Sequence, residues 1–209
     1  MPTDKSLFYY GPIYHQLFDP ALAENRQVAV GLIPEGASIL DVACGTGAFS
    51  FMLKKEKNCR VTGIDLSLKM LEFARQSNPY SDVTFHHEDA TNLSAFTDLS
   101  FDYSTILMLL HELSKTQQAA VLKEVLRVAK RAVIIDWVSP LPKNGFGIAA
   151  HIVEATFGHD HNRNFFAFLA AGGLASVLKE AALPITVEQR CVFNHNCREA
   201  VLLSMSGHS

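Results

Sequence analysis

The stretch SILDVACGTGAFS, residues 38–50, constrains the fold more than any other part of the chain. It predicts an apolar strand over residues 38–43, a tight turn at Gly45 and Gly47, and a helix that ends near Lys55. A strand that passes through a glycine turn into a helix is typical of parallel α/β sheets. Glycines in such a turn let bare backbone approach a ligand. The stretch therefore indicates a fold class and a binding site together.

Strand-like and helix-like segments alternate after this unit. Further strands are expected over residues 60–64, 83–87, 101–107 and 131–137. The helices between them are expected to begin after serine N-caps, at Ser67 and Ser114, because a serine oxygen accepts a hydrogen bond from a free amide of the first turn. Strands that alternate with helices predict a parallel sheet with right-handed crossovers.

The pattern changes after Pro140. Residues 144–182 are expected to be mostly helical, with a break near residues 172–173. The last run reads as two strands on either side of residues 194–196, which is a hairpin signal. The expected fold class is therefore α/β, a Rossmann-like, doubly wound, mostly parallel seven-stranded sheet with a C-terminal antiparallel hairpin.

Composition limits the partners and the location. The formal net charge is −3 and the pI is about 6.3, so no basic excess draws the surface to nucleic acid or anionic lipid. No apolar run reaches the ~18–20 residues that span a bilayer, and the N-terminus lacks the pattern of a signal peptide. The four cysteines are scattered, as in a reduced cytosolic protein. We expect a cytoplasmic monomer or homodimer with no membrane span and no nucleic-acid partner.

The glycine turn lacks two common phosphate-binding motifs. The run Gly-x-x-x-x-Gly-Lys-Ser/Thr of a P-loop does not occur. The dinucleotide fingerprint Gly-x-Gly-x-x-Gly/Ala fails at its third position, where Ser50 stands. An NAD-type oxidoreductase therefore stays only as an alternative interpretation.

Three aspartates follow or end predicted strands. Asp41 precedes the glycines, Asp65 lies 18 residues after Gly47, and Asp89 ends the third strand. Open α/β sheets bind ligands at the carboxyl ends of their strands, and a carboxylate in the position of Asp65 can accept both hydroxyls of a ribose. A pyrophosphate fits poorly beside so many carboxylates. A ligand with a ribose and a positive centre fits well.

Four segments stand in this order: ILDVACGTGAF (39–49), VTGIDLSLKML (61–71), VTFHHEDATNL (83–93) and FDYSTILMLLHEL (101–113). Together they resemble the successive motifs of the class I S-adenosylmethionine-dependent methyltransferases, and are similar to the branch of ubiquinone and menaquinone biosynthesis. The resemblance covers residues 36–138 well and the rest in outline. Ala43 stands where that family commonly has glycine, a small departure because alanine can still lie close to a ligand if its φ stays negative.

The resemblance implies how S-adenosylmethionine, and its product S-adenosylhomocysteine, would be held. The glycines would let the backbone pass the methionine part, Asp41 would help hold the ammonium side, and Asp65 would bind the ribose. Asp89 would accept from the adenine amino group. The cofactor-binding residues implied are Asp41, Ala43, Cys44, Gly45, Thr46, Gly47, Asp65, Leu66, Met70, Asp89, Ala90, Leu107 and Tyr14. Plain core or turn roles stay open for Met70 and Cys44.

The length of 209 residues suits a single methyltransferase domain. Within it we expect an N-terminal lid or helix region (1–35) and a cofactor-binding core (36–138). A helical substrate-lid segment (139–183) and a terminal hairpin (184–209) would follow.

His111 is the candidate general base. It follows the fourth strand on the expected ligand edge, and an ordinary histidine pKa suits proton abstraction near neutrality. A histidine at a helix entry with an ordinary hydrogen bond is the alternative.

The segment FGHDHNRNFFAF, residues 157–168, is expected to be part of the substrate lid, with His159 and His161 as substrate-binding residues. A metal site is the minority alternative, with His195 and Cys191 or Cys197 as further ligands, although the spacing matches no standard zinc pattern. We expect no metal.

Aromatic residues are frequent in the two expected lid regions. Tyr10 and Tyr14 are expected over the acceptor and the cofactor. With the phenylalanines of residues 157–168, they predict an apolar or aromatic pocket for a small methyl acceptor.

The leading functional hypothesis is methyl transfer to such an acceptor, with no general base required unless the acceptor loses a proton. A module that binds S-adenosylmethionine without catalysis stays as a further alternative. The run Asn-Pro-Tyr at 78–80 lies before the third strand, not after the fourth, and is expected to be a turn rather than a DNA-methylation motif.

Overall fold

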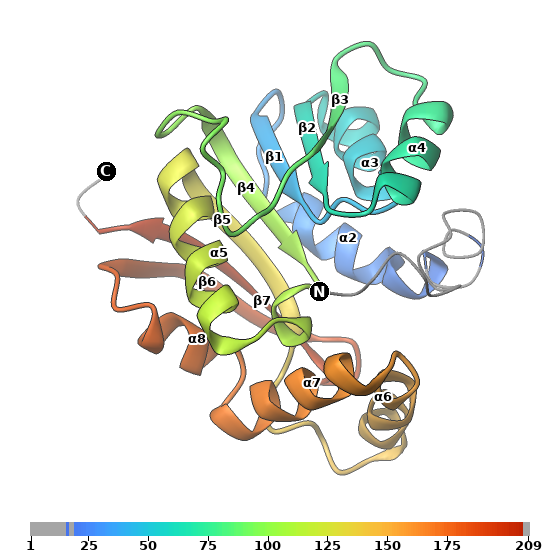
Figure 1. The fold of residues 1–209 in the computed structure, drawn as a ribbon, viewed down its shortest axis with the longest axis vertical. Coiled ribbons are helices and arrows are strands. Elements are labelled where there is room, and N and C mark those ends of the chain that lie inside the picture. Colours follow the sequence, from blue (N-terminus) through green and yellow to red (C-terminus); the bar gives the residue numbers. More distant parts are fainter. Residues whose placement is uncertain (1–15, 17–18, 207–209) are drawn as a thin grey trace.

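The computed structural model describes residue 16 and residues 19–206 (Figure 1). Seven strands of this part form one sheet in the order β3-β2-β1-β4-β5-β7-β6. The strands are β1 (Ser38–Val42), β2 (Arg60–Asp65), β3 (Val83–His87), β4 (Phe101–Leu107), β5 (Ala129–Trp137), β6 (Ile185–Phe193) and β7 (Arg198–Met205). Strands β1 to β5 pair in parallel, and β7 pairs antiparallel with both β5 and β6. The predicted fold class is confirmed.

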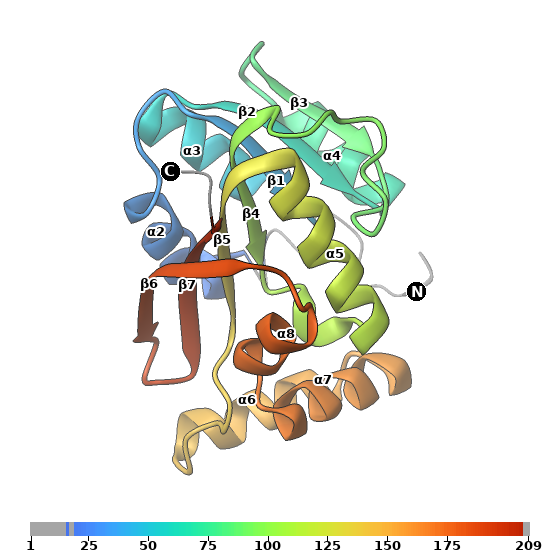
Figure 2. The same ribbon diagram turned by 90° about the vertical axis from the view of Figure 1, so that its left-hand side faces the viewer.

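Helices cover both faces of the sheet. They are η2 (Pro20–Leu22), α2 (Ala23–Gly31), α3 (Ala48–Lys57), α4 (Leu68–Ser77), η3 (Leu110–Glu112), α5 (Lys115–Val128), α6 (Gly145–Ala155), α7 (His159–Ala171) and α8 (Leu174–Glu180). Side chains of α2, α3 and α4 share one buried cluster, and those of α5 and α8 share the other. Figure 2 shows α6 and α7 apart from these layers, beyond one end of the strands.

Strand β5 is buried from both sides because its residues alternate between the two clusters. Val133 and Ile135 pack with the α2–α3 side, while Ala132 and Ile134 pack with the α5 side. All four are fully buried. A continuous apolar run is what a strand covered on both faces requires.

The predicted boundaries differ from the structure by a few residues. Ser67 and Ser114 cap α4 and α5 as expected, and Ser114 forms a capping box with Gln117. The first strand ends at Val42, so Ala43 already belongs to the turn. The predicted helical segment holds α6, α7 and α8, and its break at residues 172–173 has φ values of 109° and 65°.

The terminal hairpin has the predicted position. Asn194, His195 and Asn196 all have positive φ, which suits a tight connection between antiparallel strands. No helix in residues 19–206 combines the length and the apolar character that crossing a bilayer requires. The segment from 139 to 183 and this hairpin flank the same end of β5.

Gly47 fixes the packing of the first turn. It has a φ of 77°, and a Cβ at this position would lie 2.7 Å from Cζ of Phe85. Gly36 has a similar φ of 75° with open space around it. An alanine at Gly36 would therefore meet only the cost of a left-handed backbone, whereas an alanine at Gly47 would meet that cost and a steric clash as well.

We expect Gly36→Ala to lower the free energy of unfolding by ~1–2 kcal/mol, the cost of a left-handed residue with a Cβ. Gly47→Ala should cost about 1–3 kcal/mol more, because the added methyl group overpacks the site. Urea unfolding of the two variants measures the difference. Equal losses would show that Phe85 is not tightly packed against the turn.

Candidate functional site

One large cavity, of about 700 Å³, lies at the carboxyl ends of β1, β2 and β4. Residues of α6 and α7 form its opposite wall. The predicted site residues that line it are Ala43, Gly45, Asp65, Leu66, Met70, Asp89, Ala90, Leu107, His111 and His161. The fold therefore brings together most residues that were predicted from separate motifs.

Asp65 joins the glycine turn to the start of α4. Its Oδ2 accepts a hydrogen bond of 2.9 Å from the amide of Gly45, and its Oδ1 accepts one of 2.8 Å from the amide of Ser67. Burial raises the pKa of Asp65, although these two amides oppose the shift. Gly45 has a φ of 55° and nothing within 4 Å of the place that a Cβ would take. The turn therefore presents open backbone next to a carboxylate.

Ala43 corrects a prediction. Its φ is 56°, not negative, so this alanine takes the left-handed conformation that a glycine would take more easily. It nevertheless lines the cavity. Ala43 therefore takes the left-handed conformation of the turn although its Cβ makes that conformation unfavourable.

Asp41 lies beneath the turn and is not among the cavity-lining residues. It is 3% exposed, and its carboxylate accepts hydrogen bonds from Ser50 Oγ (2.6 Å) and Thr105 Oγ1 (3.0 Å). Burial raises its pKa to about 6 against the pull of these hydroxyls. Asp41 thus ties β1 to α3 and β4 behind the surface that a ligand would touch.

Three other predicted residues of the turn also lie behind the cavity surface. Cys44, Thr46 and Gly47 are buried and absent from the lining. Thr46 Oγ1 donates to Asp19 at 2.7 Å. Burial raises the pKa of the Cys44 thiol well above its usual value, so the thiol stays neutral and unreactive.

The far half of the cavity has the composition of a purine site. Leu66 is 46% exposed, Met70 is buried, and both line the cavity. Asp89 follows β3, and its Oδ1 accepts from the amide and the hydroxyl of Thr91. Ala90 lies next to it in the lining. An apolar floor with a carboxylate at its edge can hold a flat, amine-bearing ring.

His111 lies in the cavity wall but is not a free base. Its Nδ1 is 2.7 Å from Asp136 Oδ1, and its Nε2 is 3.5 Å from Glu154 Oε2. Burial opposes the charge of the imidazolium, but Asp136 and Glu154 outweigh burial and raise the pKa to about 10. In this arrangement His111 is protonated at neutral pH. The predicted role as a general base needs a neutral imidazole, and this geometry does not supply one.

The structure separates the two predicted lid histidines. His161 lines the cavity, and its Nε2 lies 2.5 Å from Glu154 Oε2. His159 is exposed at the start of α7 and is not part of the lining, so its assignment to the substrate site is not supported. The same holds for the exposed Cys191 and for His195, which stacks on Phe146. Tyr10 and Tyr14 lie outside the described residues.

Four important residues were missed. Asp136, Trp137 and Glu154 contact His111, and Arg198 lies on the ring of Trp137. Glu154 had a signal, because it is the single carboxylate of α6, whose other residues are apolar except for His151. Asp136 also had one, since an acid inside the buried strand VIIDW needs a partner. The pairing itself depends on segments far apart in the sequence.

The buried Asp41 predicts a pH dependence of stability. In the unfolded chain its pKa is near 3.8, and in the fold it is about 6. Between these values the unfolded chain releases the proton first, so the free energy of unfolding falls as pH rises. Above pH 6 the loss is complete, on the order of 3 kcal/mol.

Asp41→Asn removes this penalty. The variant should therefore gain stability relative to the parent protein by ~2–3 kcal/mol between pH 4 and pH 7. Urea unfolding at both pH values measures the gain. Asp102→Asn is the control, because contacts with Lys130 and Ser38 lower the pKa of Asp102 to about 2, so its stabilising charge is already present at pH 4 and this variant should be destabilised by nearly the same amount at both pH values. If the free energy of unfolding changed equally with pH in Asp41→Asn and in the parent protein, the result would contradict a buried charge at Asp41.

Comparison with known families agrees with the motifs. Residues 39–132 match a family model described as a methyltransferase domain. The O-methyltransferase cnsE of Penicillium expansum is 41% identical over 136 residues, which cover 62% of this chain and 49% of that protein. A demethylmenaquinone methyltransferase of Bacillus licheniformis is 38% identical over 101 residues, which cover 47% of this chain and 42% of that protein. The chain thus spans less than half the length of these curated relatives.

Solved structures agree with the fold over nearly the whole chain. The PH0226 protein of Pyrococcus horikoshii superposes with a TM-score of 0.72 at 23% identity, over 95% of this chain and 96% of that one. Structures titled as S-adenosylmethionine-dependent methyltransferases share the same fold. The resemblance is therefore confirmed: residues 39–132 match the methyltransferase-domain model, and the chain shares the fold of these S-adenosylmethionine-dependent methyltransferases.

Proposed function

We propose that the protein transfers a methyl group from S-adenosylmethionine to a small apolar or aromatic acceptor. The proposal rests on one observation. A single cavity runs from the carboxyl ends of β1, β2 and β4 to an aromatic pocket under α6 and α7. A transferase needs both ligands in one enclosed space, because transfer requires the acceptor in line with the methyl carbon.

The cofactor half of the cavity would hold S-adenosylmethionine by its ribose and adenine. Asp65 would accept from the ribose hydroxyls, at the cost of a small rearrangement of its bonds to backbone amides. Leu66 and Met70 would pack against the adenine, with Asp89 and Ala90 at its edge. Leu107 would lie beside the methionine part, and Gly45 would let the backbone pass it. Asp41 would act from beneath the turn, by holding Ser50 and Thr105 in place.

The acceptor half combines aromatic rings with one cation. Trp137, Phe146 and Phe157 line it, together with Arg198. Nε and Nη1 of Arg198 are buried and have no hydrogen-bond partner among the described atoms, and its guanidinium stacks on Trp137. Buried donors of this kind are normally satisfied. An oxygen of the acceptor would satisfy them, so we infer a ring-bearing acceptor that carries at least one oxygen.

Names of the relatives support this class of acceptor. One relative is an O-methyltransferase and another is named for demethylmenaquinone. In the proposed reaction the bond between the methyl carbon and the sulfonium breaks, and its electron pair stays on sulfur as S-adenosylhomocysteine forms. The acceptor atom supplies the pair for the new bond, and any proton that it loses is released to solvent when the products leave the site. The chain contributes alignment and exclusion of water.

Calorimetry with S-adenosylmethionine, S-adenosylhomocysteine and NAD tests the proposal directly. We expect the first two to bind with micromolar dissociation constants and NAD not to bind. Asp65→Ala should weaken binding of S-adenosylhomocysteine by ~1–3 kcal/mol, or about 5–150-fold, because the ribose hydroxyls lose their acceptor.

Asp82→Ala is the matched control for Asp65. Asp82 is an exposed carboxylate before β3, at the opposite end of the strands, and should leave the affinity unchanged. Tighter binding of NAD than of either sulfur compound would overturn the proposal. If both compounds bind but a panel of phenols, quinols, thiols and amines is never methylated, the non-catalytic binding module becomes the better interpretation.

A further inference from the structure

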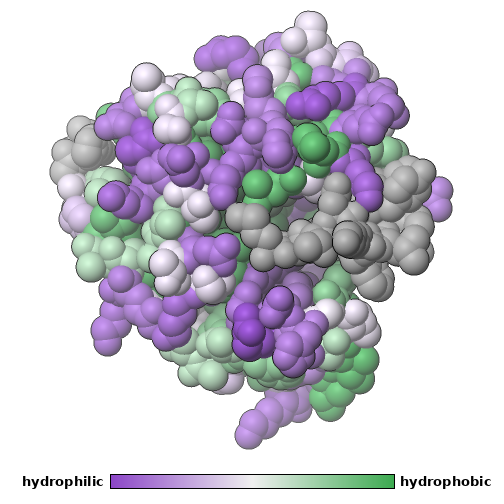
Figure 3. All heavy atoms as spheres, in the orientation of Figure 1, coloured by the Kyte–Doolittle hydropathy of each residue, from purple (hydrophilic) through white to green (hydrophobic). Residues whose placement is uncertain are grey.

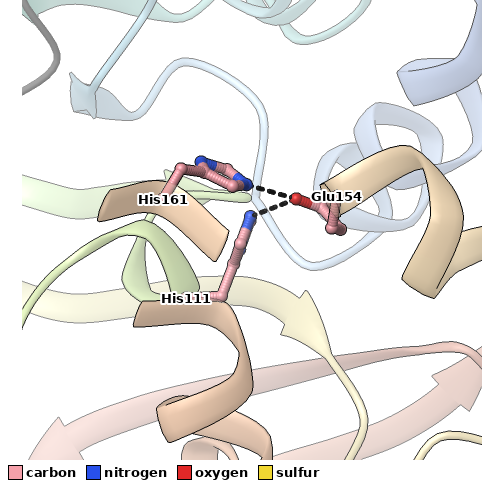
Figure 4. A group of neighbouring side chains, drawn as sticks. All are labelled: His111, Glu154 and His161. Carbon is pink, nitrogen blue, oxygen red and sulfur yellow. Dashed lines mark hydrogen bonds and ion pairs between the residues drawn. The ribbon is translucent and has the colours of Figure 1, made fainter. Parts of the chain in front are cut away.

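Three side chains from three segments meet in the wall between the cavity and the lid. His111 comes from η3, Glu154 from α6 and His161 from α7, as Figure 4 shows. One potential ligand atom from each lies within 4.8 Å of the other two. Both imidazole Nε2 atoms point at the same oxygen, Glu154 Oε2, at 3.5 Å and 2.5 Å. All three residues also line the cavity.

A hydrogen bond from behind orients His111 and Glu154, and a carboxylate lies near the far nitrogen of His161. Asp136 Oδ1 lies 2.7 Å from His111 Nδ1, so Nδ1 carries the hydrogen and Nε2 points toward the cluster. Glu112 Oε2 lies 3.9 Å from His161 Nδ1. Trp137 Nε1 donates to Glu154 Oε1 at 2.9 Å. Histidines that bind metals nearly always give their other nitrogen to a carboxylate or carbonyl in this way.

The charges around the cluster call for a cation. Asp136, Glu154 and Glu112 are three carboxylates, and Arg198 is the guanidinium next to them. A dication would displace the proton that His111 holds in its absence, and with two neutral imidazoles it would bring these groups to a net charge of zero. Glu154 Oε2 is the oxygen that faces both imidazoles, while Trp137 Nε1 donates to the other oxygen. Oε2 is therefore the atom that Glu154 can offer to a metal ion.

The geometry also distinguishes a metal site from a simple ion pair. One histidine would suffice to pair with Glu154, but two converge on it. Ligand atoms about 2.0–2.2 Å from a tetrahedral ion are ~3.3 Å apart, which the cluster reaches with small side-chain shifts. Two imidazoles and one carboxylate suit Zn²⁺ and Fe²⁺ rather than Ca²⁺ or Mg²⁺, which prefer oxygen.

We propose that His111, Glu154 and His161 form a site for a divalent transition metal of the two-histidine, one-carboxylate type. The site replaces the metal alternative drawn from sequence, because only His161 of that set takes part. Three protein ligands leave coordination positions that water or an oxygen or nitrogen of a ligand in the cavity can take. If the proposed methyl transfer is correct, such a ligand would be the acceptor, held between the metal and Arg198. Metal binding itself does not depend on that function.

Titration with Zn²⁺, and with Co²⁺ followed by its visible absorption, tests the site in the full chain after treatment with a chelator. We expect one equivalent of each ion to bind with a micromolar or lower dissociation constant. His161→Ala and Glu154→Gln should each weaken binding at least 10-fold. Asp136→Asn should weaken it about 10–100-fold through the orientation of His111.

His159→Ala is the matched control, because it removes an exposed histidine of the same helix, two residues from His161. This variant should bind one equivalent as tightly as the parent. Circular dichroism and the affinity for S-adenosylhomocysteine, measured on the same preparations, establish that each variant is folded. Absence of binding, or binding that His161→Ala and Glu154→Gln leave unchanged, would overturn the proposal. Neither result changes the binding of S-adenosylmethionine and S-adenosylhomocysteine measured by calorimetry. The metal proposal and the methyltransferase proposal can therefore fail independently.

Discussion

Parallel pairing of β1 with both β2 and β4 is the constraint on which the rest of the site depends. In this register Asp41 is opposite Gly63 on one side and Thr105 on the other. The strand ends therefore meet at one edge, and the carboxylate of Asp65 can reach the amide of Gly45 in the turn after β1. No side chain in the cofactor half would be in place if these strands ran in opposite directions. The buried Asp41 adds a cost in stability for the support that it gives to this turn.

The lid is held to the sheet by polar contacts as well as by apolar packing. Trp137 packs against His111 and Phe165, and its indole donates to Glu154 of α6. Trp137, His111 and Glu154 also line the cavity, so the residues that join α6 to the sheet would face an acceptor bound there. Figure 3 shows hydrophobic residues at the surface near α6, where Phe146, Ile148 and Ile152 are exposed. Helix α6 therefore has a polar contact on its inner side and apolar residues on its outer side.

Local patterns were enough to predict the sheet and the cofactor half. A glycine turn after an apolar strand fixes its own backbone, and a carboxylate at a strand end goes to the ligand edge of any parallel sheet. Ala43 was misjudged because the demands of the turn override the preference of a residue with a Cβ. The cluster around Glu154 could not be predicted, since it depends on how α6 and α7 pack against η3. His159 and His161 look alike in the sequence, and only their positions on α7 decide which one faces the cavity.

The central claim is that one cavity holds the cofactor at the strand ends and the acceptor under the lid. A crystal structure of the protein with S-adenosylhomocysteine tests it most directly. The account predicts ribose hydroxyls at Asp65, adenine between Leu66 and Asp89, and the sulfur directed toward the half that contains Trp137 and Arg198. A ligand bound outside this cavity, or with its adenine under α6 and α7, would contradict the account.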